Sequence, residues 1–138
     1  MATLATIRAA LVTRLETAIG SPLRVSPTVP EMWVFPAAVI AYLGPVEGPY
    51  ATLGGNAYDD FGITFAVQAS DLPNAQEALD AYMSHSGASS LQAAIEGGPT
   101  LGGAVDFAQL ASWEEPGQLV EGDAAVHAAR AHVHVWHT

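Results

Sequence analysis

The chain has 138 residues, with 14 Asp and Glu against 4 Arg and no Lys, which gives a formal net charge of −10. So acidic a chain argues against sequence-independent nucleic-acid binding and against docking on an anionic membrane, because both need a basic face. With no long apolar run, no basic-then-apolar opening and no cysteine, we expect no membrane span, signal segment, disulfide, thiol nucleophile or cysteine-bound zinc.

The length predicts one domain over residues 1–138. Half of the residues are hydrophobic and only 13% are charged, so the charged cover of the surface is thin. A surface with so few charges is typical of chains that bury part of it against partner subunits. The alternative is a coding bias towards alanine, which produces the same composition.

Residues 3–19 predict an amphipathic helix with Thr3 as its cap, which ends before Gly20 and Pro22. Its apolar stripe consists of Leu4, Ile7, Leu11, Leu15 and Ile19. Arg8 lies close to this stripe. Two interpretations stay open: its charged end reaches solvent at the edge of the stripe, or it pairs with a carboxylate of a neighbouring subunit.

Three strands are expected next. Residues 23–26 form a short one, and residues 37–43, apolar on both alternating faces, form a central one. Between them, residues 27–36 contain three prolines and are expected to be irregular or at an edge. Residues 44–57 predict a loop, and residues 58–69 alternate cleanly. Phe61, Ile63, Phe65 and Val67 point one way, and Asp60, Gly62, Thr64 and Gln68 the other.

Ser70 or Asp71 then caps a second helix, with Pro73 in its first turn. Its apolar side consists of Leu72, Leu79, Tyr82 and Met83, and a third helix follows over residues 89–96. A strand over residues 104–113 alternates around Val105, Phe107 and Trp113, a turn covers residues 114–123, and a last strand covers residues 125–137. This order predicts an α+β fold, with a mostly antiparallel four- to five-stranded sheet and the N-terminal helix and central helical pair packed on one face.

Histidines gather in the last predicted strand. Strand alternation places His132 and His134 on one face and His127 and His137 on the other. No carboxylate lies close to them in the sequence, and zinc needs three or four ligands, so no metal site is predicted.

The other candidate motifs predict no catalysis. The pairs Asp59-Asp60 and Glu114-Glu115 are sequence neighbours, so their side chains should diverge. Gly54-Gly55-Asn56 precedes a strand and lacks the residues of a P-loop, and residues 87–91 lack the last glycine of a nucleophile elbow. We therefore assign no catalytic, cofactor-binding or metal residues and expect a protein that is not an enzyme.

Several stretches together resemble the tail terminator family of long-tailed bacteriophages, also called tail completion, neck or minor tail proteins. The first is the opening helix with the strand and proline segment that follow it (LRV at 23–25 and PAAV at 36–39). The second is the phenylalanine-bearing strand that precedes the helix QEALDAY at 76–82. The others are SGASSLQAAIE at 86–96, TLGGAVD at 100–106 and a last strand near the C-terminus. The resemblance covers nearly the whole chain, and its motifs are architectural.

This resemblance implies a structural virion protein, assembled in the host cytoplasm and located in the tail or neck. It implies a homo-hexameric ring that caps the tail tube, ends tube polymerisation and presents the surface for the head-tail connector or head-closure protein, with no cofactor. DNA would pass through the ring without specific binding. The alternatives are a head-closure or connector protein and, from another class, a small α+β ligand-binding or enzymatic domain.

Three expectations concern such a ring. The polar side of helix 3–19, with Arg8 and Arg14, and the outer face of the sheet should make the subunit contacts. Residues 44–57 should touch the tube or a neighbour. Because acidic groups repel DNA, a large share of the turn and strand carboxylates should line or rim the channel: Glu47, Asp59, Asp60, Glu114, Glu115, Glu121 and Asp123. The alternative is that the acidity only keeps an apolar chain soluble.

Overall fold

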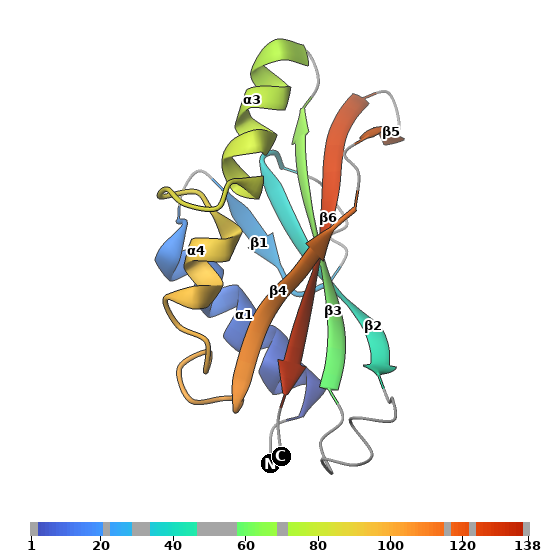
Figure 1. Ribbon diagram of the computed structural model, residues 1–138. Coiled ribbons are helices and arrows are strands. Elements are labelled where there is room, and N and C mark those ends of the chain that lie inside the picture. Colours follow the sequence, from blue (N-terminus) through green and yellow to red (C-terminus); the bar gives the residue numbers. More distant parts are fainter. Residues whose placement is uncertain are drawn as a thin grey trace.

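The computed structural model describes residues 3–20, 23–28, 34–46, 58–68, 72–114, 117–121 and 124–136 (Figure 1). Its elements in chain order are α1 (Leu4–Ala18), β1 (Arg24–Ser26), β2 (Ala37–Val46), β3 (Tyr58–Gln68), α3 (Leu72–Met83), α4 (Leu91–Glu96), β4 (Phe107–Trp113), β5 (Gly117–Glu121) and β6 (Ala124–Trp136). The predicted α+β class is therefore confirmed.

The strands form one twisted sheet in the order β1-β2-β3-β6-β4. Among the described strands, β1 and β2 run parallel and the other pairings are antiparallel. β4 and β5 both pair with β6, β4 along residues 131–136 and β5 along residues 124–128. They lie end to end on one edge of β6, so the six described strands occupy five positions across the sheet. The mostly antiparallel sheet is confirmed.

All three described helices cover the same face of the sheet (Figure 1). In α1, Ile7, Leu11 and Leu15 are fully buried, and the Thr3 side chain accepts a hydrogen bond from the Thr6 amide at 3.1 Å. The three buried α1 side chains belong to one core with Leu79 and Tyr82 of α3 and with Leu91 and Ile95 of α4. The core also contains the predicted inward row of β3: Phe61, Ile63, Phe65 and Val67. Among the described residues, no helix combines the length and apolar character needed to cross a membrane.

Arg14 joins α1 to α4. Its Nε donates a hydrogen bond to the carbonyl oxygen of Ala94 at 2.7 Å. The turn after α4 leaves room for this side chain, because a Cβ at Gly98 would lie 2.8 Å from the Arg14 Nε and one at Gly97 would lie 2.7 Å from an outer guanidinium nitrogen. The two glycines therefore let Arg14 reach the carboxyl end of α4, where backbone carbonyls favour a cation.

Three sequence expectations are corrected. Residues 44–46, predicted as loop, extend β2 past an irregularity at Tyr42/Gly44. The predicted turn 114–123 contains strand β5. Phe107 and Trp113 lie on opposite faces, because a register shift between Leu110 and Ser112 reverses the alternation. Phe107 is exposed, whereas Trp113 packs on the core.

Candidate functional site

The face of the sheet without helices carries an unusual set of side chains. At one end of this face Phe35 packs against Ala66, Val126 and Ala128. Beyond them lies a region that we call the open face, made of Leu43, Tyr58, Asp60, Thr64, Phe107, Glu114, Arg130, His132, His134 and Trp136. The open face contains the strongest candidate functional site among the described residues.

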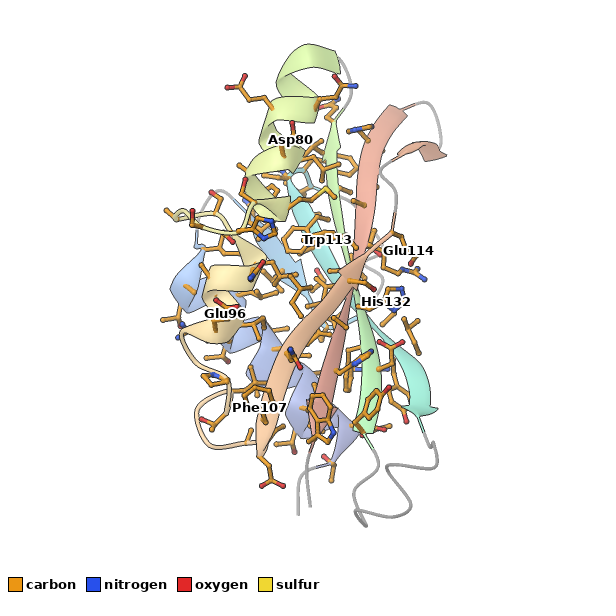
Figure 2. The ribbon with its side chains drawn as sticks, in the orientation of Figure 1. Asp80, Glu96, Phe107, Trp113, Glu114 and His132 are labelled. Carbon is orange, nitrogen blue, oxygen red and sulfur yellow. The ribbon has the colours of Figure 1, made fainter. Side chains whose placement is uncertain are left out.

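A charged cluster lies at the centre of the open face. The His132 Nδ1 is 3.1 Å from the Asp60 Oδ2, and its Nε2 is 3.1 Å from the Glu114 Oε2. Figure 2 shows His132 and Glu114 on the side of the sheet away from the helices. The alternation places His132 and His134 on one face as predicted, and the His134 Nε2 lies 4.0 Å from the Asp60 Oδ1.

Arg130 completes the cluster. Its Nε donates to the Thr64 Oγ1 at 3.2 Å and lies 3.9 Å from the Glu114 Oε2. A Cβ at Gly62 would meet the Leu43 Cδ1 at 2.9 Å and the Arg130 Cδ at 3.1 Å. Glycine at this position therefore lets the Leu43 and Arg130 side chains lie across β3.

The carboxylates that meet His132 come from distant parts of the sequence, since Asp60 belongs to β3 and Glu114 follows β4. Both ring nitrogens of His132 face a carboxylate, so the imidazole joins the side chains of Asp60 and Glu114 across β6.

An aromatic row borders the cluster at the end of the sheet where β6 ends. The Tyr58 and Trp136 ring centroids are 5.0 Å apart, and those of Phe107 and Trp136 are 5.9 Å apart. Tyr58 also lies 4.5 Å from the His134 ring. Phe107 is 46% exposed. The open face thus combines exposed apolar surface with paired charges, the composition of a contact surface.

Asp59 lies on the other side of the sheet. As predicted, Asp59 and Asp60 diverge: Asp59 is 8% exposed, and the Tyr42 hydroxyl donates a hydrogen bond to its Oδ1 at 2.8 Å. Asp59 is therefore not available to line a channel, contrary to the expectation, because its odd position in β3 turns it towards the helices. Glu47, Glu115 and Asp123 lie outside the described residues, as does the Glu121 side chain.

Two further histidines belong to the last predicted strand. His127 is buried on the helix-bearing face, and its Nδ1 has no hydrogen-bond partner among the residues that the structure describes. His137 lies outside the described residues. Within the part of the chain that the structure describes, no group of three or more His, Asp or Glu side chains is arranged to hold a metal ion.

The Tyr42–Asp59 pair predicts a response to alkaline pH. Burial, followed by the hydrogen bond to Asp59 and its charge, raises the pKa of Tyr42 from 10.0 to about 12. A raised pKa favours the neutral phenol in the folded chain, so its contribution to stability is complete below pH 10.0 and is lost as the pH rises to about 12. Tyr42→Phe should remove one late step from the alkaline absorbance titration. A variant that keeps every late step of the unmodified chain would refute the assignment.

Comparisons with known proteins add no assignment. No protein-family model matches the chain, and a search of the curated proteins finds no significant match.

Proposed function

We propose that the protein is a structural component of a bacteriophage virion, a tail terminator that caps the tail tube as a hexameric ring and joins it to the head. The resemblance of residues 23–39, 76–96 and 100–106 to that family supports the proposal. The fold agrees with it, since the α+β domain has its described helices on one face.

The observation that carries the proposal is the two-sided architecture. Helices cover one face, and the other keeps aromatic and charged side chains available for contact. A closed ring is built from head-to-tail contacts between two different patches of the same chain. A two-layer domain with unlike faces can supply both.

The acidity of the chain agrees with a ring through which DNA slides. A basic channel would hold DNA by counterion release, whereas carboxylates repel it over about 8 Å at physiological salt. Asp60 and Glu114 remain the described candidates for the channel, although each already contacts His132.

Native mass spectrometry of the purified chain at high concentration, and of chain bound to tail tubes, tests this function. We expect six copies in a ring and no tight, salt-sensitive binding of duplex DNA. A ring that binds only connector proteins would favour the head-closure alternative. A twofold dimer with a small molecule bound would favour the ligand-binding or enzymatic class and contradict the proposal.

A further inference from the structure

We propose that His132 is a pH-dependent switch: its protonated ring holds the Glu114 side chain at the end of β4, and its neutral ring releases that side chain towards Arg130. The inference goes beyond the proposed ring and does not depend on it, because it needs only the side chains of a single chain.

The His132 ring lies between two carboxylates that come from different strands. Both Asp60 oxygens lie near its Nδ1, at 3.1 and 3.3 Å, and the Glu114 Oε2 lies 3.1 Å from its Nε2. Asp60 belongs to β3, His132 to β6, and Glu114 directly follows β4. Since β3, β6 and β4 are consecutive in the sheet, the ring connects the end of the edge strand β4 to β3.

The number of protons on the ring decides how many of these contacts can be hydrogen bonds. A protonated imidazole donates from both nitrogens, whereas a neutral one has a single N–H and a lone pair on the other nitrogen. An ionised carboxylate only accepts. Histidine generally changes charge between about pH 5 and 8, where aspartate and glutamate are normally ionised. When the ring loses its proton, one of the two carboxylates therefore faces a lone pair and is repelled.

Glu114 is the carboxylate that the neutral ring releases. Its side chain is 54% accessible, against 19% for Asp60, so water can replace the lost hydrogen bond more readily at Glu114. Glu114 also has a second cation within reach, because the Arg130 Nε lies 3.9 Å from the same Oε2. The neutral ring should therefore keep its proton on Nδ1, towards Asp60.

The other charged or titratable side chains on the described part of this face are Arg130, His134 and Tyr58. Arg130 keeps its charge throughout this pH range. Tyr58 lies against the His134 ring, with 4.5 Å between the centroids. His134 can change charge in the same range, but the described carboxylate that it approaches is Asp60, at 4.0 Å. Loss of the His134 proton therefore leaves the Glu114 contact in place.

The switch has a defined direction. The protonated ring makes both contacts, and the neutral ring makes only the contact with Asp60. A contact that a histidine makes only when it is charged stabilises the fold in acid, and its contribution is lost as the pH rises. The end of β4 should therefore be held more tightly in mild acid than in mild alkali.

Heteronuclear NMR of the imidazole nitrogens tests the switch directly. The acid form of His132 should carry a proton on each nitrogen, and the neutral form a single proton on Nδ1. His132→Gln identifies the signals, because it removes them from the spectrum. A neutral form with its proton on Nε2 would overturn the inference, since that ring would still donate to Glu114.

A double-mutant cycle of His132→Ala and Glu114→Ala, measured by chemical denaturation, tests the contact itself. At about pH 5.5 the coupling should change the unfolding equilibrium constant by about two- to fivefold, the range for accessible ion pairs, and at about pH 8 it should vanish. Asp80→Ala is the matched control, because Asp80 is an exposed carboxylate on α3 and should show no coupling to His132 at either pH (Figure 2). Equal coupling of His132 and Glu114 at both pH values would overturn the inference.

Glu114→Gln should make the contact insensitive to pH. A glutamine amide has an acceptor oxygen and a donor nitrogen, so it can bond to the Nε2 of either form of the ring. Its coupling to His132 should be the same at about pH 5.5 and about pH 8. Coupling of the glutamine that is lost at the higher pH would overturn the inference. His134→Gln should keep the pH dependence of the unmodified chain, and loss of that dependence would assign the switch to His134 instead.

Discussion

Replacing Phe65 by alanine should lower the free energy of unfolding by about 3–5 kcal/mol, the usual cost of truncating a buried phenylalanine. Phe65 is fully buried, and its ring centroid lies 5.0 Å from that of Tyr82 in α3 and 5.6 Å from that of Trp113 in β4. The side chain therefore holds a helix and an edge strand on the centre of the sheet. Chemical denaturation of the purified variant measures the loss.

Phe107→Ala is the matched control for this experiment. Phe107 is also a sheet phenylalanine, but it lies on the open face and is 46% exposed. Its removal should change the unfolding free energy of the monomer by less than about 1 kcal/mol, because exposed positions contribute little to stability. Equal losses for both variants would contradict the division of the sheet into a core face and an open face.

Arg14→Ala should destabilise the fold by about 1.5–3 kcal/mol, the range for a hydrogen bond made by a charged group. The change leaves the Ala94 carbonyl at the end of α4 without its 2.7 Å partner. Arg24→Ala, at an exposed position, should have little effect. This role differs from the sequence expectation for Arg14, which placed it at a subunit contact. Intact stability together with lost assembly would restore that expectation.

Gly98→Ala tests the contact between Arg14 and the end of α4 by crowding the Arg14 side chain. A Cβ at Gly98 would lie 2.8 Å from the Arg14 Nε, so the arginine must move or the turn must shift. We expect a loss of about 1–3 kcal/mol, typical of overpacking. Gly117→Ala should be tolerated, since nothing lies within 4 Å of its Cβ position. Similar stability of the two alanine variants would refute the crowding.

Side-chain periodicity was sufficient to predict most of the fold. Apolar residues at Ile7, Leu11 and Leu15 are fully buried, as their helical spacing indicates, and the alternation in β3 assigns each side chain to the correct face. β5 was missed because Pro116-Gly117 and Gly122-Asp123 are turn signals on both sides of a short strand. The register shift that places Phe107 and Trp113 on opposite faces cannot be recognised from the alternation of apolar residues in the sequence.

The charged cluster depends on strand register, which the sequence pattern does not reveal. Gly62 pairs with His132 and Asp60 with His134, and only this alignment brings Asp60 diagonally to the His132 ring. Ser112 pairs with His132 from the other side, which carries Glu114 to the opposite ring nitrogen. Strand alternation assigns Asp60, His132 and His134 to the polar faces of their strands. Whether these side chains come into contact depends on the register in which β3, β6 and β4 pair.

Electron microscopy of tubes polymerised from the tube protein, with and without this chain, tests most directly whether the chain ends the growth of a tail tube. Tubes formed with the chain should carry a ring on one end and stop growing, and tubes formed without it should continue to lengthen. Tubes that reach the same lengths in both samples, with no ring at either end, would contradict the account.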